Sequence, residues 1–210
     1  MFDGLINQGA TQDLRPGLAE SWKPIDDLAQ NSSCAAASGS TTARFNADDV
    51  VCTFKRAPDV PAPRAVSGLY TKRSKTVVKV DDYTVHIKTT RASLPLVAND
   101  VSTIAIVSDG AGCGASTDDF NKGKAAVGTG PWKFVEYVPG DRIVLDHNDG
   151  YWGDKPEFSR AILKPIKSDP ARVAALLAGD VDLINDVPDR RWQAQKRAQG
   201  LDQRGPVQTG

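Results

Sequence analysis

Hydrophobic and polar residues alternate most regularly over residues 75–90, KTVVKVDDYTVHIKTT. Valine and isoleucine alternate there with lysine, threonine and histidine on either side of Asp81 and Asp82. A period of two indicates two strands with one apolar face, and the paired aspartates supply the turn. The residues expected on the apolar face are Val78, Val80, Tyr83, Val85 and Ile87.

A second hairpin is predicted further along the chain. A strand begins at Trp132, turns at residues 139–141 (Pro-Gly-Asp), and returns through residues 142–146. Asn148-Asp149-Gly150 ends the return strand, and Tyr151-Trp152 is expected to fold back as an aromatic lid on the sheet. Another strand is expected over residues 161–166.

Capping residues predict two helices. Asn46 precedes two aspartates and an apolar periodicity, which predicts a helix over residues 46–57. Asp169 followed by Pro170 predicts the start of a second helix, and Gly179 its end.

Other stretches are less regular. We expect a short helix and loop over residues 1–23, an irregular segment over 25–43, a flexible connector over 110–117, a short strand over 181–187 and a frayed tail over 189–210. Strands and helices alternate without a regular βαβ repeat, which favours a mixed α/β (α+β) fold. Two subdomains, residues 1–110 and 111–210, are expected to meet near residue 110.

Composition excludes several partners. The chain has 26 basic and 26 acidic residues, so its zero net charge gives no support for nucleic acid or an anionic membrane as partner. Its longest apolar runs, such as Val101–Val107, are far too short to cross a bilayer. The first residues lack the basic and apolar regions of a signal peptide.

The three cysteines are Cys34, Cys52 and Cys113, and no CxxC pair is present. This spacing argues against a zinc or redox motif, and the odd number leaves at least one thiol free. We interpret them as small buried thiols, with one disulfide, for instance Cys34–Cys52, as the alternative.

Catalytic chemistry is not indicated. His86 and His147 are the two histidines, no GxSxG motif is present, and the group around His147 (Asp146, Asp149) is too local for a metal site. Gly128-Thr129-Gly130 precedes a strand and matches no phosphate loop, so we expect these glycines to allow a tight approach to that strand. We therefore predict no enzyme activity, no metal and no cofactor.

Aromatic residues are the remaining candidates for ligand contact. Trp132, Tyr151 and Trp152 are expected to pack on a sheet. Tyr70 follows a proline-rich loop and precedes the first hairpin, where it could either reach a ligand cleft or pack against the protein.

Five segments together resemble the family 5 extracellular solute-binding proteins. They are RPGLAESW (15–22), FNADDVVCTFKRA (45–57), VDDYTVHIKT (80–89), the Gly-Thr-Gly-Pro to Tyr-Trp-Gly region (128–156) and DPARVAALLAGDVDLINDVP (169–188). The resemblance covers most of the chain in the family's order. Between Asp27 and Arg44 the family's strand and turn are replaced by the Ser/Ala-rich segment.

The resemblance implies the first lobe of a two-lobed, periplasmic-binding-protein-like receptor. Residues 1–110 would form a small β-rich subdomain and residues 111–210 part of the main domain, with the second lobe and the signal peptide absent. Such receptors act without catalysis, as monomers, outside the cytoplasm; they bind a peptide-like small solute and deliver it to an ABC permease. By the same resemblance, Tyr70 and the loop containing Ser102 and Thr103 would lie near the ligand.

Two other functions remain open. A chain that kept this fold but lost transport would be a structural or interaction module, consistent with the missing lobe. A small-amide hydrolase rests only on His147 and the neighbouring acids.

Overall fold

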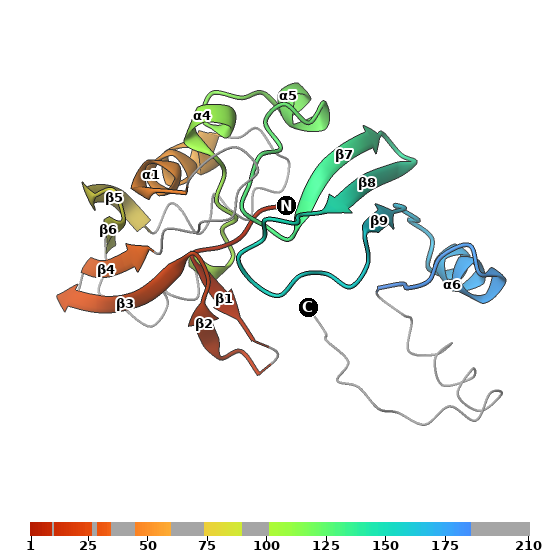
Figure 1. The fold of residues 1–210 in the computed structure, drawn as a ribbon, viewed down its shortest axis with the longest axis horizontal. Helices are drawn as coiled ribbons and strands as arrows, with labels where there is room; N and C mark the ends of the chain where they lie inside the picture. The colour runs from red at the N-terminus through yellow and green to blue at the C-terminus, as the bar shows by residue number, and fades with distance from the viewer. Residues whose placement is uncertain (10, 27–28, 35–44, 60–73, 90–100, 186–210) are drawn as a thin grey trace. The chain divides into compact units, whose positions relative to one another are not determined.

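The computed structural model describes residues 1–185 except 10, 27–28, 35–44, 60–73 and 90–100 (Figure 1). The chain divides into two compact units, residues 1–163 and 164–210, which are described separately. The predicted boundary near residue 110 stays a prediction. No helix in the described residues is long and apolar enough to cross a membrane.

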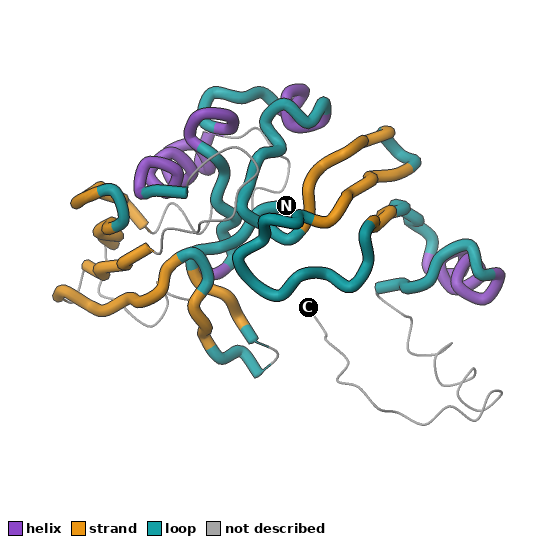
Figure 2. Tube along the Cα trace, viewed as in Figure 1, coloured by secondary structure: helices purple, strands orange, loops and turns teal. Residues whose placement is uncertain are grey.

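The described part of the first unit contains three antiparallel sheets and short helices, coloured by type in Figure 2. The sheets are β1-β2, β3-β4-β6-β5 and β7-β8-β9. The strands are β1 (Ile6–Gln8), β2 (Leu14–Pro16), β3 (Ala19–Asp26), β4 (Ala29–Cys34), β5 (Ser74–Asp81), β6 (Thr84–Thr89), β7 (Trp132–Val138), β8 (Arg142–His147) and β9 (Arg160–Leu163). The helices are α1 (Ala47–Arg56), the 3-10 turn η1 (Ala57–Asp59), α4 (Asp109–Gly112) and α5 (Thr117–Asn121).

Helix α1 begins as its sequence predicts. The Asn46 side chain accepts from the backbone N–H groups of Asp48 at 2.7 Å and Asp49 at 3.4 Å, and the Asp49 carboxylate accepts from the Asn46 backbone at 2.8 Å. This capping box satisfies N–H groups that lack partners within the helix. The prediction of a capped helix here is confirmed.

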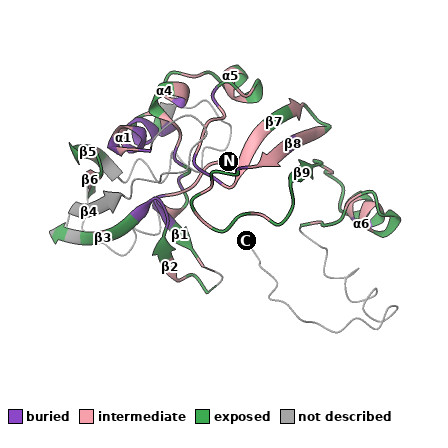
Figure 3. Cartoon of the chain, in the orientation of Figure 1, coloured by how far each residue is buried: buried purple, intermediate pink, exposed green. Residues whose placement is uncertain are grey.

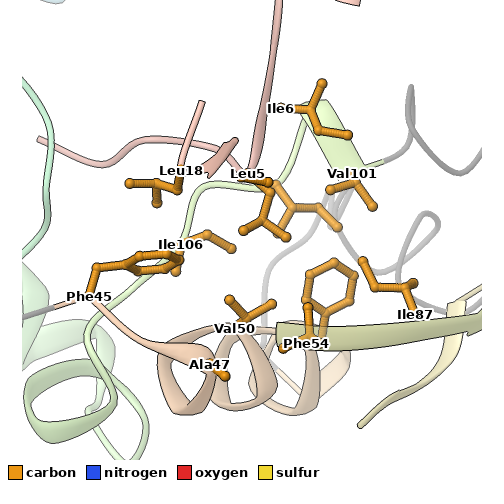
Figure 4. Close-up of a cluster of buried hydrophobic side chains, with 13 residues drawn as sticks. Leu5, Ile6, Leu18, Phe45, Ala47, Val50, Phe54, Ile87, Val101 and Ile106 are labelled. Atoms are coloured by element: carbon orange, nitrogen blue, oxygen red, sulfur yellow. The ribbon is translucent and has the colours of Figure 1, made fainter. Parts of the chain in front are cut away.

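The main core lies between α1, β6 and the N-terminal strands (Figure 4). Figure 3 shows the buried residues concentrated on α1 and the N-terminal strands. The buried cluster consists of Leu5, Ile6, Leu18, Ala19, Phe45, Ala47, Val50, Phe54, Val85, Ile87, Val101, Ile104 and Ile106.

The first hairpin is confirmed, but its apolar face on β5 is not. Val78 and Val80 are exposed, and Val77 packs against the core instead. Val77 pairs with the buried Ile87, and directly paired residues share a face. A one-residue difference in register exchanges the two faces of a strand. The alternation of residues along β5 therefore predicted the wrong face as the buried one. Tyr83, in the turn, is also exposed.

The expected helix over residues 1–23 is wrong, because these residues form β1, β2 and most of β3. Leu18 and Ala19 donate backbone hydrogen bonds to Gly4 and Leu5 at 3.0 and 2.9 Å. Pairing between these segments buries Leu5 and Leu18, and such tertiary contacts outweigh local propensity.

The expectation of an irregular segment at 25–43 is wrong where the structure describes it. Residues 29–34 form β4, which pairs with β3 on one side and β6 on the other. A polar strand is stable in this position because both neighbours satisfy its backbone groups. Residues 35–43 lie outside the described residues.

The expected flexible connector at 110–117 is also wrong. The segment contains α4 and the start of α5, and Ser116 and Asp119 form a capping box at α5. The glycines in this stretch suggested flexibility, whereas contacts with α1, described below, hold it in place.

The second hairpin and the strand after it are confirmed. Gly140 adopts φ 79° in the turn between β7 and β8, a conformation that favours glycine. The expected strand at 161–166 is observed as β9, which pairs with β8 but already ends at Leu163.

The second unit contains α6 (Asp169–Ala178) in its described part. Gly179 ends this helix at φ 78°, as predicted. Asp169 is not the capping residue, because Ser168 has the extended backbone of the N-cap and Asp169 is already helical. Residues 181–185 form no strand, contrary to expectation, and 186–187 lie outside the described residues.

Candidate ligand-binding site

The N-terminal segment lies between two others that are distant in sequence. Gly4 pairs with Ala105 in an antiparallel bridge, and Ile106 donates to the Asp3 carbonyl at 2.9 Å. Gly130 donates to the Met1 carbonyl at 3.0 Å. We call this meeting of residues 1–6, 101–107 and 128–130 the N-terminal junction.

The Asp3 carboxylate connects the junction to the aromatic pair after β8. Its Oδ2 atom accepts hydrogen bonds from Thr129 Oγ1 at 3.2 Å and from Trp152 Nε1 at 3.0 Å. Trp152 stacks obliquely on Tyr151, with ring centroids 5.5 Å apart. Burial, followed by the charges of Asp3 and Asp154, raises the pKa of Tyr151. The aromatic pair is therefore connected to the N-terminal segment through Asp3, and its predicted role as a lid on the sheet stays a prediction.

The Gly-Thr-Gly turn requires glycine because backbone atoms approach it closely. A Cβ on Gly128 would lie 2.4 Å from the Met1 carbonyl oxygen, and one on Gly130 would lie 2.7 Å from the Met1 carbonyl carbon. These distances are shorter than any van der Waals contact. The buried Asn148 stabilises the turn, because its side-chain amide donates a 3.0 Å hydrogen bond to the Gly130 carbonyl.

One row of α1 side chains holds the segment that follows the junction. We call Asp49, Cys52, Thr53 and Arg56, at helical spacing i, i+3, i+4 and i+7, the α1 row. Asp49 accepts from the Asp109 backbone at 2.6 Å, and Thr53 from the Val107 backbone at 3.0 Å. Arg56 donates to the Ala115 carbonyl at 3.0 Å, and its guanidinium lies over the Phe120 ring.

Cys52 completes the α1 row through a disulfide to Cys113, with Cα atoms 5.7 Å apart. The interpretation as free thiols is therefore wrong for Cys52 and Cys113. The alternative of one disulfide is confirmed, but it joins Cys52 to Cys113 and not to Cys34. The side chain of Cys34 lies outside the described residues. A pairing over 61 positions could not be read from the sequence, because only the packing of α1 against the 107–115 segment brings the two residues together.

Asp49 is the buried ionisable group of this region. Burial raises its pKa, although hydrogen bonds from the Asp109 and Asn46 backbones act in the opposite direction. It borders a cavity of about 20 Å³ shared with Thr129 and Ser108, room for about one water molecule. This cavity is too small for a solute.

Of the three residues predicted from the sequence to contact a ligand, the structure describes two, Ser102 and Thr103. Ser102 is half-buried and Thr103 exposed, and they follow and precede the buried Val101 and Ile104. A Cβ on Gly4 would lie 3.5 Å from the Ser102 carbonyl oxygen, so this loop borders the N-terminal junction. Tyr70 lies outside the described residues. Their contact with a ligand stays a prediction.

Of the acids around His147, Asp146 pairs with Arg160 and Asp149 lies against the histidine itself. Arg160 forms two bonds to Asp146, at 2.6 and 3.0 Å, and holds the pKa of that carboxyl below its usual range. His147 Nε2 lies 3.0 Å from Asp149 Oδ1. Among the described residues, the group with metal-compatible spacing is instead Cys52, Asp109 and Cys113.

The fold is that of periplasmic binding proteins. The oligopeptide-binding protein AppA of Bacillus subtilis, solved with a nonapeptide, superposes with a TM-score of 0.75 at 27% identity and covers 94% of this chain and 40% of its own. MoaA of A. tumefacien R10, solved with mannopinic acid, gives 0.77 at 26% identity and covers 95% and 41%. The predicted fold class is thereby confirmed.

Residues 39–210 match the family described as bacterial extracellular solute-binding proteins, family 5 middle, and the chain belongs to this family. Heme-binding protein A of Haemophilus influenzae is 30% identical over 95% of the chain and 41% of its own length. The peptide transport periplasmic protein SapA of Salmonella typhimurium is 29% identical over 88% and 38%. The chain thus spans about two fifths of the length of these relatives.

Proposed function

We propose that this chain is the first-lobe part of the substrate-binding component of an ABC importer for peptides or similar small solutes. The observation that carries the proposal is the family match over residues 39–210. It acts by binding rather than by catalysis, as a monomer, and passes its solute to a membrane permease.

A peptide-like ligand is favoured over other solutes by the relatives' names. SapA and AppA are named for peptides, whereas heme-binding protein A is named for heme. Peptides are therefore the class to test first, with heme as the comparison.

An extracytoplasmic location is supported by the Cys52–Cys113 disulfide. Disulfides persist in oxidising compartments and are rare in the reducing cytosol. Both this location and the periplasmic names among the relatives agree with a receptor role.

The ligand would contact the loop beside the N-terminal junction. Thr103 is exposed there, and Ser102 and Tyr70 complete the proposed contacts. Because related receptors are about two and a half times longer, this part supplies only some of the ligand contacts, and we expect weak binding.

Calorimetry on the full 210-residue chain with pools of di- to nonapeptides, and separately with heme, tests this proposal. We expect binding to at least one peptide pool, weakened by Thr103→Arg and unchanged by Thr117→Arg, an exposed threonine on α5. Absence of binding by every peptide pool while heme binds would overturn the peptide assignment.

The second candidate is a transport-inactive interaction module of the same fold. It predicts no small-molecule binding at all, together with capture of a protein partner, and the same calorimetry distinguishes the two.

A further inference from the structure

One cluster of metal-ligating side chains in the described residues lies beside the α1 row. The Sγ atoms of Cys52 and Cys113 and a carboxylate oxygen of Asp109 all lie within 4.8 Å of one another. In this structure the two sulfurs form a disulfide. Reduction of that disulfide would leave two thiols and a carboxylate close together.

The surrounding backbone is held by contacts that do not involve sulfur. The α1 row bonds the N–H groups of Val107 and Asp109 and the carbonyl of Ala115. These three bonds do not depend on the disulfide, so its reduction leaves the segment docked on α1. The Cα atoms of Cys52 and Cys113, 5.7 Å apart, therefore stay close.

Two thiolates and a carboxylate suit Zn²⁺. Zinc binds thiolate at about 2.3 Å in tetrahedral geometry, which sets two sulfur ligands about 3.8 Å apart. That separation needs only a small movement of side chains already within 4.8 Å of one another. Cys52 is buried, Cys113 half-buried and Asp109 exposed, so the fourth position faces water.

The charges near the cluster are compatible with a cation. The Asp49 side chain accepts a 2.6 Å hydrogen bond from the Asp109 backbone and places no cation beside the cluster. The nearby cation, Arg56, directs its guanidinium toward the Ala115 carbonyl and the Phe120 ring.

We propose that reduction of the Cys52–Cys113 disulfide converts this cross-link into a Zn²⁺ site formed by both thiolates and the Asp109 carboxylate. A dithiol supplies two electrons and two protons, becomes a disulfide itself, and leaves two thiols on the protein. Zinc binding then releases both thiol protons. Residues 107–115 can thus be joined to α1 either by the disulfide or by Zn²⁺, but not by both at once. This inference is independent of the proposed transport function.

The test uses the full chain with Cys34→Ser, which removes the third thiol. The protein is reduced with a phosphine, and the phosphine is then removed under anaerobic conditions. The reduced protein is titrated with Zn²⁺ in competition with a chelating dye. A separate titration uses Co²⁺ as a spectroscopic probe. We expect one metal ion per chain, a thiolate-to-cobalt charge-transfer band, and no such binding by the oxidised protein. Affinity should fall as the pH is lowered, because thiolates must form.

Variants separate this site from adventitious thiol binding. Asp109→Asn should weaken zinc binding by at least about tenfold, whereas Asp118→Asn, a matched exposed aspartate on α5, should not. Circular dichroism of each reduced protein reports whether α1 and the sheets are retained. The proposal is overturned if Asp109→Asn binds zinc as tightly as the parent, or if a Cys52→Ser/Cys113→Ser variant still shows the cobalt band. If the reduced protein is unfolded, Asp109→Asn and the parent will not differ in zinc affinity, and that result would also overturn the proposal.

Discussion

Asp3 and Trp152 are 149 positions apart, yet the Trp152 indole donates to the Asp3 carboxylate at 3.0 Å. Thr129 donates to the same oxygen at 3.2 Å. One acidic side chain thereby connects the N-terminal segment, the Gly-Thr-Gly turn and the aromatic pair. Thr129 and Trp152 both belong to the 128–156 segment on which the family resemblance rests, whereas Asp3 lies outside all five segments.

Trp152→Phe should lower the free energy of unfolding by about 1–2 kcal/mol, because it removes a hydrogen bond to a charged group. A double-mutant cycle with Asp3→Asn, measured by urea unfolding, isolates this pair. Trp132→Phe is the matched control, and its effect should be additive with Asp3→Asn. Additivity of Trp152→Phe with Asp3→Asn would show that the bond contributes nothing.

Gly128→Ala should destabilise the protein by about 2 kcal/mol or more, since the new Cβ would lie 2.4 Å from the Met1 carbonyl oxygen. Gly110→Ala is the control, because its Cβ would meet no atom within 4 Å and alanine favours helices. Thermal unfolding distinguishes them. Equal melting temperatures for the two variants would contradict the close approach seen at the junction.

Loss of the disulfide should be costly. For residues separated by 61 positions, chain entropy in the unfolded state predicts a loss of up to about 4 kcal/mol in Cys52→Ala/Cys113→Ala. Urea unfolding under non-reducing conditions measures this loss, and Cys34→Ala serves as the control. Peptide mapping without reductant should recover the Cys52–Cys113 pair, and recovery of a Cys34–Cys52 pair would refute the connectivity.

The burial of Asp49 should make stability depend on pH. Its folded pKa is raised above the ordinary value of 3.8, so the native state holds the proton more tightly than the unfolded state. The stability that Asp49 contributes is therefore greatest below the unfolded pKa and is lost as the pH rises through the folded pKa.

Asp49→Asn checks this sign. The variant loses one of two accepted backbone bonds, at a cost of about 1 kcal/mol, and no longer titrates. The unfolding free energy of the parent minus that of the variant should fall as the pH rises above about 3.8, the ordinary pKa of the carboxyl. An increase over this range would mean that the hydrogen bonds to Asp49, rather than its burial, dominate. Asp48→Asn, on the same turn but half-buried, is the matched control.

Local signals sufficed for the elements whose stabilising contacts are close in sequence. The Asn46 cap, the Gly140 turn and the Gly179 helix end were all predicted because each depends on the conformation or hydrogen bonding of neighbouring residues. The N-terminal strands and β4 were missed, since their backbone partners are supplied by other segments. On β5, alternation identified a strand but chose the wrong face, because register with β6 decides which side is buried.

The sequence by itself determined the mixed α/β class, the principal hairpins and helices, and membership of the solute-binding family through five ordered segments. Only the tertiary structure decided the Cys52–Cys113 pairing, the convergence on Asp3 and the α1 row along residues 107–115. Each of these joins residues far apart in the chain. Their proximity follows from the packing of α1 against residues 107–115 and of the N-terminal segment against residues 128–130, and no local periodicity encodes that packing.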